Sequence, residues 1–278
     1  MSDNPEIANT IQTGAFKTNY HDVGEGSPVF MIHGSGPGVT AWANWRLVIP
    51  ALAKHHRVIA PDMAGFGYTE RVDGYEYTME NWVQHAIDLM DALEIKKAHL
   101  VGNSFGGGLA IALAIKHPER VDRLVLMGAA GVSFELTKGL DEVWGYEPSV
   151  ANMRKMMDLF AYNRNLVTDE LAELRYKASI QPGFQESFSA MFPAPRQRWV
   201  EALASDPEDI KKIQHETLMV HGREDIVVPP VTSTTLFDLI PNSQLHMFGC
   251  CGHWTQIEHN ARFTGLVLDF LAEENRTE

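Results

Sequence analysis

Short apolar runs alternate with longer helical patterns along most of the chain. Buried strands are predicted at Pro28–His33, Arg57–Ala60, His99–Val101, Leu124–Met127, Leu218–His221 and Gln244–Phe248. Helices are predicted between them at Trp42–Lys54, Met79–Leu93, Phe105–Lys116, Val231–Leu239 and Ala261–Ala272. Continuously apolar strands that alternate with helices predict an α/β protein with a mostly parallel, doubly wound sheet covered on both faces.

Residues 133–207 interrupt this alternation, because they show helical patterns but no convincing strand. One apolar helix face in this segment is formed by Met153, Met156, Met157 and Phe160. Their i, i+3, i+4, i+7 spacing is typical of an ordinary packing surface. We therefore expect an α/β core formed by residues 1–132 and 208–278, with residues 133–207 as a helical lid over the sheet.

The composition of the chain indicates which classes of binding partner and which cellular compartment to expect. The 278 residues carry a formal net charge of −13, which disfavours nucleic acid and anionic membranes as partners. The N-terminal sequence has no basic region or apolar run, and no stretch approaches the ~18 apolar residues of a membrane helix. The two cysteines, Cys250 and Cys251, are adjacent and are expected to be free thiols. We expect a cytoplasmic protein.

The strongest chemical motif is Gly102-Asn103-Ser104-Phe105-Gly106, which matches the G-x-S-x-G pattern of a nucleophile elbow. It follows an expected strand and opens an expected helix, so the turn between them leaves room only for small residues around the serine. The helix N-terminus also favours negative charge that develops near Ser104. This context favours a nucleophilic serine over a plain glycine-rich turn between a strand and a helix.

A second glycine-rich segment, HGSGPG at 33–38, follows the first expected strand. In a hydrolase with a nucleophile elbow, this loop donates one backbone N–H to the oxyanion hole, and the residue after the nucleophile donates the other. We therefore expect the N–H groups of Ser35 and Phe105 to form the hole, with the Ser35 hydroxyl as a candidate third donor. A phosphate-binding loop is the alternative, but the spacing fits neither dinucleotide-binding nor P-loop patterns.

The acid and the base of a catalytic triad are expected after the lid, because this architecture orders the triad as Ser, acid, His. One candidate loop carries Glu224 and Asp225 after a strand, and another carries His253 after the next strand. His253 would take the proton from Ser104, and Asp225 would hold the imidazole. We prefer Asp225 to Glu224 because the residues after it turn the loop back toward the site; Asp62 is a weaker candidate. No metal-binding pattern is present, so no metal or other cofactor is indicated.

The lid sequence places one arginine on an apolar helix face. Arg175 lies four residues after Leu171, with Leu174 and Ala178 on the same side. An inward-facing guanidinium needs an anionic partner, which is either a structural carboxylate, slightly favoured from the residues alone, or a substrate carboxylate. The aromatic residues that would form an apolar wall, if they do not simply pack, are Trp144, Trp199 and Trp254.

These segments resemble the meta-cleavage product hydrolases, which have the α/β-hydrolase fold, and among them most closely the 2-hydroxymuconate-semialdehyde hydrolases. The similarity extends from about residue 15 to residue 272 and includes the lid. The motifs that carry it are HGSGPG at 33–38, Asn44 in WANW, GNSFGGG at 102–108, VWGYEP at 143–148, ELRYKASIQPGF at 173–184, HGRED at 221–225 and CGHW at 251–254.

The resemblance implies a hydrolase of aromatic catabolism that cleaves a C–C bond of 2-hydroxy-6-oxohexa-2,4-dienoates. The substrate would be 2-hydroxymuconate semialdehyde or a 6-alkyl analogue, and the products would be 2-hydroxypenta-2,4-dienoate and formate or acetate. The family's carboxylate-binding arginine matches Arg175, and its pocket asparagine matches Asn103. Other substrate-side positions match Asn44 and Trp254. Positions at the far end of the pocket match Ala130, Val200 and Val228.

Two other functions remain open at the level of sequence. A carboxylesterase for small esters would use the same triad, and a non-catalytic ligand-binding protein could share the same fold. The complete triad argues against the second. Ser35, where the biphenyl branch of the family usually has Gly, argues against a bulky aryl ketone substrate. We also expect a homo-oligomer, of a size that no residue pattern specifies.

Overall fold

The computed structural model describes residues 4–273 of the chain. Its strands form one sheet with the order β1-β2-β4-β3-β5-β6-β7-β8. In chain order they are β1 (Asn9–Thr13), β2 (Phe16–Val23), β3 (Pro28–Ile32), β4 (Arg57–Pro61), β5 (Ala98–Asn103), β6 (Val121–Met127), β7 (Thr217–Gly222) and β8 (Ser243–Phe248). Antiparallel pairing joins β1 to β2 and β2 to β4, and every other neighbouring pair is parallel. The prediction of a mostly parallel sheet is confirmed.

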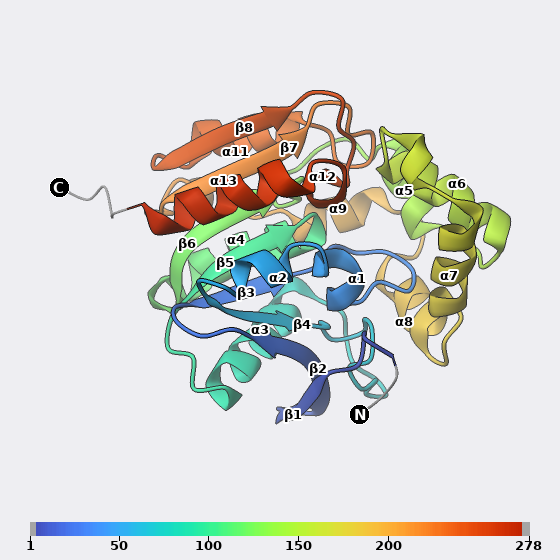
Figure 1. Ribbon diagram of the computed structural model, residues 1–278, viewed down its shortest axis with the longest axis horizontal. Helices are drawn as coiled ribbons and strands as arrows, with labels where there is room; N and C mark the ends of the chain where they lie inside the picture. Colours follow the sequence, from blue (N-terminus) through green and yellow to red (C-terminus); the bar gives the residue numbers. More distant parts are fainter. Residues whose placement is uncertain (1–3, 274–278) are drawn as a thin grey trace.

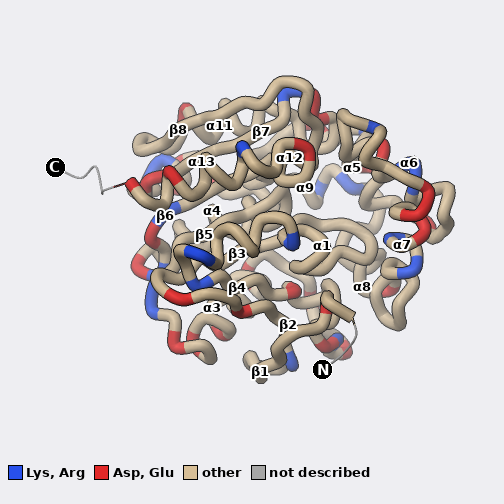
Figure 2. Tube along the Cα trace, viewed as in Figure 1, with Lys and Arg blue, Asp and Glu red and all other residues tan. Residues whose placement is uncertain are grey.

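The central strands are apolar because both of their faces are covered. All six residues of β5 and of β7 are buried, as are four of the five residues of β3. Neither β3 nor β5 contains Lys, Arg, Asp or Glu, and Figure 2 shows the charged residues mainly on outer helices and loops. Strands of this kind are typical of parallel sheets between two helix layers.

Helices flank the sheet on both faces. They are α1 (Ala41–Trp45), α2 (Ile49–Leu52), α3 (Met79–Ala92), α4 (Phe105–Lys116), α5 (Lys138–Trp144), α6 (Val150–Phe160), α7 (Asp169–Ser179), α8 (Phe184–Met191), α9 (Gln197–Leu203), α10 (Pro207–Ile210), α11 (Val231–Leu239), α12 (Thr255–Glu258) and α13 (Asn260–Ala272), with 3₁₀ turns at Pro118–Arg120 and Arg164–Leu166. One buried cluster joins α1, α2 and α13 to the sheet, and a second joins α3, α4 and α11 to its other face. Figure 1 shows α1, α2 and α13 in front of the strands.

The interval between β6 and β7 contains helices α5 to α10 and no strand. In Figure 1, α5 to α8 are grouped beyond one end of the sheet, next to the carboxyl ends of the parallel strands. This is the edge at which ligands bind in α/β sheets. The division into a core and a lid at 133–207 stays a prediction.

Two features of the fold differ from the sequence prediction. The strands β1 and β2 were not expected, because β2 has the mixed sequence FKTNYHDV rather than an apolar run. The single helix expected at Trp42–Lys54 is instead two short helices, α1 and α2. Pro50 explains the break, because a proline ring clashes with the carbonyl group four residues earlier, which here belongs to Arg46.

Two expectations drawn from composition also concern the fold. Cys250 is exposed and Cys251 is buried, and both are free thiols, as predicted. Within residues 4–273, no helix has the length and apolar character needed to span a membrane.

Candidate active site

Ser104 occupies a strained turn between β5 and α4. Its backbone has φ 53° and ψ −115°, a region that residues other than glycine rarely adopt. Hydrogen bonds hold it there: the Ser104 N–H donates to Met127 O at 2.9 Å, and its carbonyl accepts from the Ala130 N–H at 3.0 Å. The serine is therefore fixed at the carboxyl end of β5 by its neighbour strand, β6.

The glycines around the serine are required by close backbone packing. A Cβ atom on Gly102 would lie 2.3 Å from the Gly106 carbonyl oxygen, and one on Gly106 would lie 2.3 Å from the Ile32 carbonyl oxygen. Both contacts are far shorter than real Cβ atoms show, and the obstructing atoms belong to the backbone. The prediction that this turn admits only small residues is confirmed.

The two other members of the predicted triad follow β7 and β8, and their side chains meet each other. His253 Nδ1 donates to Asp225 Oδ2 at 2.6 Å. A Cβ atom built on Gly128 would lie 3.4 Å from His253 Nδ1 and 3.5 Å from Asp225 Oδ2. Gly128 directly follows Met127, which holds the Ser104 backbone, so the three segments converge at the end of β6. Each of the three predicted triad residues is 5 % exposed.

The Asp225 carboxylate is surrounded by donors. Its Oδ1 accepts from the N–H groups of Val227 at 2.8 Å and Val228 at 3.0 Å. Its Oδ2 accepts from His253 and also from His221 Nε2 at 3.1 Å. Burial alone would raise the pKa of Asp225, but the charge of His253 and the hydrogen bonds from both histidines outweigh it and hold the pKa well below its usual range. The carboxylate therefore stays ionised.

The competing acids take other roles. Glu224 accepts from the Cys251 N–H at 3.0 Å and pairs with Arg223 at 2.7 Å, while its neighbour Asp225 contacts the histidine. Asp62 is fully buried and accepts from the backbone of Ala41 at 2.6 Å and Tyr68 at 2.8 Å, which orders the chain around α1. The geometry therefore favours Asp225 as the orienting acid.

The predicted oxyanion loop is built around His33. Its Nδ1 bonds to the Gly34 carbonyl at 2.8 Å, and its Nε2 accepts from the Met63 N–H at 3.0 Å. A Cβ atom on Gly34 would lie 3.3 Å from the Ser104 Cβ, so this loop runs directly beside the serine. Within residues 4–273, neither the Ser35 N–H nor the Phe105 N–H donates to a protein group, which leaves both for a ligand.

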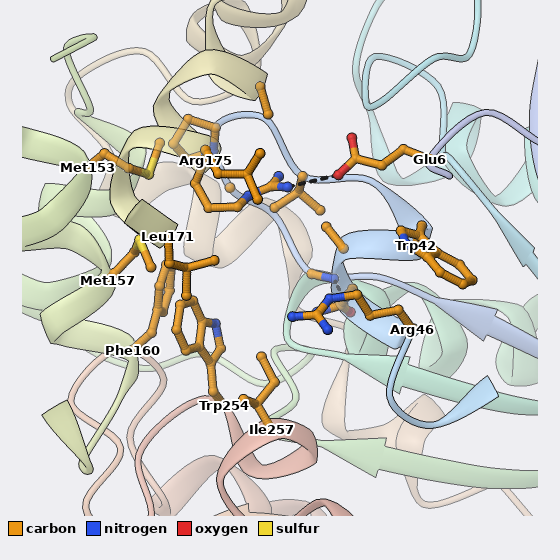
Figure 3. Close-up of a pocket in the computed structure, with 18 of the residues that line it drawn as sticks. Glu6, Trp42, Arg46, Met153, Met157, Phe160, Leu171, Arg175, Trp254 and Ile257 are labelled. Carbon is orange, nitrogen blue, oxygen red and sulfur yellow. Dashed lines mark hydrogen bonds and ion pairs between the residues drawn. The ribbon is translucent and has the colours of Figure 1, made fainter. Parts of the chain in front are cut away.

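Two cavities share Ser35 in their linings, and the smaller one also borders Ser104. The larger one has a volume of about 780 Å³, and Figure 3 shows part of its lining. The smaller one, about 10 Å³, is lined by Ser35, Ser104, Phe105, Ala130, Phe134, Leu140, Trp144, Val200, Leu203 and Val228. The predicted substrate residues divide between them. Those that line the larger cavity are Asn44, Asn103, Arg175 and Trp254. Those that line the smaller one are Ala130, Trp144, Val200 and Val228.

Arg175 meets a carboxylate of its own chain. Its Nη1 lies 2.9 Å from Glu6 Oε1, and Nη2 donates to the Gly38 carbonyl. The structure thus supplies the structural partner that the sequence left open, while Arg175 also lines the larger cavity. Leu174, expected on an apolar helix face, is 60 % exposed, and it borders the same cavity.

The expected tryptophan wall does not form as one surface. Trp144 lines the small cavity, Trp254 lines the large one, and Trp199 lines neither.

Sequence reasoning assigned the apolar stripe of α6 to packing alone, yet it also faces the large cavity through Met153, Met156, Met157 and Phe160. Residues that pack and residues that line a cavity have the same i, i+3, i+4, i+7 spacing, so the spacing alone does not distinguish the two roles.

Similar known proteins identify the family of this chain. The α/β-hydrolase fold family matches residues 27–260. The chain is 66 % identical to a 2-hydroxymuconate semialdehyde hydrolase of Pseudomonas sp. strain CF600, over 98 % of this chain and 96 % of that protein. It is 65 % identical to a 2-hydroxy-6-oxo-2,4-heptadienoate hydrolase of Pseudomonas putida, over 98 % of this chain and 99 % of that protein. The chain belongs to the meta-cleavage product hydrolases.

A solved structure supports the same assignment. A meta-cleavage product hydrolase from Pseudomonas fluorescens IP01, a serine-to-alanine variant complexed with acetates, is 65 % identical with a TM-score of 0.96. The match covers 96 % of this chain and 98 % of that chain. The α/β-hydrolase fold expected for this meta-cleavage product hydrolase is therefore confirmed.

Sequence reasoning missed two groups in the site of this hydrolase. His221 shares the Asp225 carboxylate, and its Nδ1 bonds to the Ser233 hydroxyl at 2.7 Å. Its position four residues before the acid, at the end of β7, was the available signal. Glu6 reaches Arg175 from the N-terminal segment, and no local pattern signals that pairing.

Replacing Gly106 by Ala tests the packing of the elbow in this hydrolase. The new Cβ would lie 2.3 Å from one backbone oxygen and 2.6 Å from another, so β3 or α4 must shift. We expect the free energy of unfolding to fall by about 2 kcal/mol or more, with loss of turnover. Gly265→Ala is the matched control, because nothing lies within 4 Å and alanine stabilises a helix by up to about 1 kcal/mol. Urea unfolding gives both values, and a Gly106→Ala protein as stable as the parent would contradict the argument.

The pH dependence of stability tests the neutral state of His33. Burial lowers its pKa from 6.5 to about 4, so the unfolded chain binds the extra proton between these values. The free energy of unfolding should therefore fall as pH decreases from 6.5 to 4. Asp62, whose pKa burial raises to about 6, acts in the opposite direction. We expect the parent to lose about 2 kcal/mol more than His33→Gln between pH 7 and pH 4.5. Equal losses in urea titrations at the two pH values would show that His33 is not held neutral.

Proposed function

We propose that this hydrolase cleaves the C5–C6 bond of 2-hydroxy-6-oxohexa-2,4-dienoates that carry hydrogen or methyl at C6. The products are 2-hydroxypenta-2,4-dienoate and formate or acetate. The observation that supports the proposal is that Ser104 borders a small apolar cavity, which shares Ser35 with a large cavity that contains polar and charged groups. A volume of about 10 Å³ corresponds to roughly one water-sized group. A methyl group is of this size, whereas a phenyl ring is several times larger.

The large cavity suits the acidic end of such a substrate. Arg175 offers guanidinium N–H groups to a carboxylate. Asn103 Nδ2 donates to Asn44 Oδ1 at 3.2 Å, which fixes the Asn103 side chain. Its Oδ1 is buried and accepts no hydrogen bond from residues 4–273. A buried acceptor of this kind is costly unless a donor reaches it, and the 2-hydroxyl of the substrate is such a donor.

In the proposed mechanism the substrate first changes tautomer. His253 assists transfer of the proton from the 2-hydroxyl to C5, which converts the dienol into a 2-keto compound. The step is needed because the C5–C6 bond otherwise has no electron acceptor. After it, the electron pair released by that bond enters the conjugated C3=C4 and 2-keto system. The ionised Asp225 stabilises the imidazolium form of His253 in each proton transfer.

Ser104, or a water that it activates, then attacks the C6 carbonyl. The N–H groups of Ser35 and Phe105 stabilise the oxyanion that forms. Trp144 Nε1 donates to Ser35 Oγ at 3.2 Å, which leaves the Ser35 hydroxyl proton available as a third donor. Cleavage leaves the dienoate in the large cavity and the one-carbon or two-carbon acyl group in the small one. Attack by water gives the free acid directly, whereas attack by Ser104 gives an acyl ester that a water molecule then hydrolyses to the acid. The helices at 133–207 would act as the lid that excludes water, and a homo-oligomer stays part of the proposal.

The substrate panel is the direct test of this function. Ring-fission products of catechol and 3-methylcatechol should lose their yellow colour rapidly, and the product of 2,3-dihydroxybiphenyl should react much more slowly. Ser104→Ala should lower kcat by at least about 10³-fold, with unchanged folding by circular dichroism. Rapid hydrolysis of neutral esters with no action on these compounds would instead identify a carboxylesterase. Wild-type turnover by Ser104→Ala would remove the serine from the mechanism.

Val200→Ala tests the role of the small cavity. The change removes two methyl carbons from its wall and should raise kcat/KM for 6-ethyl over 6-methyl substrates by about tenfold, since one methylene in a hydrophobic pocket changes selectivity by 10-fold or more. Val150→Ala is the matched control, because Val150 is 41 % exposed and lines neither cavity. Steady-state kinetics on both substrates give the ratio. The same ratio in both variants would place the C6 substituent elsewhere.

A further inference from the structure

Arg175 carries little net charge for a substrate to use. Its side chain is 17 % exposed and that of Glu6 is 14 % exposed, so the pair is largely shielded from water. At 2.9 Å the two charges neutralise each other. A substrate carboxylate that joins Arg175 would lie close to the Glu6 carboxylate and would be repelled by it. An anionic substrate therefore needs a further positive charge in this cavity.

The lining of the larger cavity contains that charge. The ionisable Lys, Arg, Asp and Glu residues that line it are Glu6, Arg46, Arg175 and Lys177. Lys177 pairs with Glu173 at 3.0 Å, and its side chain is 64 % exposed. Arg46 forms neither an ion pair nor a side-chain hydrogen bond with any residue in the described range 4–273. Figure 3 shows its guanidinium extending into the cavity, on the side that faces Trp254 and below the Arg175–Glu6 pair.

The chain holds Arg46 in this place through the break between α1 and α2. Arg46 is the C-cap of α1, and its N–H donates to the Trp42 carbonyl at 2.8 Å. A cation at the C-terminus of a helix is favoured by the helix dipole. Asn44 on the same short helix also lines the cavity and binds Asn103, so α1 presents an amide and a guanidinium to one ligand.

We infer that Arg46 is a second anion-binding residue, and that its uncompensated charge attracts the substrate carboxylate and holds it beside Arg175. The inference rests on the proposed function, because it assumes a dienoate substrate. The net charge of the chain is −13, so the molecule as a whole repels an anionic substrate, and a local positive charge at the cavity offsets this repulsion. Arg46 provides a local positive potential at the cavity, and Glu6 serves mainly to hold Arg175 in place.

Steady-state kinetics of Arg46→Gln on the ring-fission product of 3-methylcatechol test the inference. We expect kcat/KM to fall about tenfold, almost entirely through KM, because the charge acts on binding and not on bond cleavage. Added salt should lower kcat/KM of the parent more than that of the variant, since salt screens exposed charges over about 8–10 Å. Arg46→Lys should restore most of the loss. Lys54→Gln removes one positive charge outside the cavity and should match the parent.

The outcomes separate this inference from the function on which it rests. If the parent does not act on dienoates, the proposed function fails before Arg46 is tested. If the parent is active, an equal loss of kcat/KM in Lys54→Gln and Arg46→Gln would overturn the inference. It would show that the loss comes from the change in net charge and not from the position of Arg46. A fall in kcat with unchanged KM, or an unaltered salt dependence, would overturn it as well. Thermal unfolding of each variant checks that the fold is intact.

Discussion

The buried carboxylate of Asp225 is the group on which the site depends. It receives two backbone N–H groups from its own loop and two imidazole N–H groups, from His221 and His253. A buried charge is tolerated only when it is fully paired. The same four bonds therefore stabilise the ion, shape the loop after β7 and fix the ring after β8. The orientation of the His253 ring therefore follows from the hydrogen bonds that stabilise the Asp225 carboxylate.

The helical segment after β6 takes part in the same arrangement. The carbonyl group of Phe160, the last residue of α6, accepts the N–H groups of His253 at 2.8 Å and Trp254 at 3.3 Å. The Phe160 ring also stacks on the imidazole, with centroids 5.6 Å apart. The expected lid would therefore do more than cover the sheet, because its helix α6 holds the backbone of His253, the proposed base. Displacement of α6 would alter the position of the imidazole along with access to the cavity.

The parts of this molecule that could be predicted from sequence are those specified locally. The elbow is recognisable because five consecutive residues must fit one tight turn, and the order of acid and histidine follows from the order of parallel strands. The edge strand β2 was missed because its polar residues are paired inside the fold, where Thr18 and Asn19 are fully buried. Glu6 and Arg175 are far apart in the chain, so their pairing becomes visible only in three dimensions. Arg46 appeared to belong to a continuous helix, and only Pro50 marked the break.

The large and the small cavity have different linings that share Ser35. Charged side chains line the large cavity, whereas the lining of the small cavity is mainly apolar and includes Ser104. In the proposed binding mode, substitutions in the wall of the small cavity would change which acyl fragment is accepted without disturbing the end that recognises the acid. Enzymes with such a division could differ in the substituent that they accept at C6 and still recognise the same acidic end. One fold would then suit pathways whose starting aromatic compounds differ only in a ring substituent.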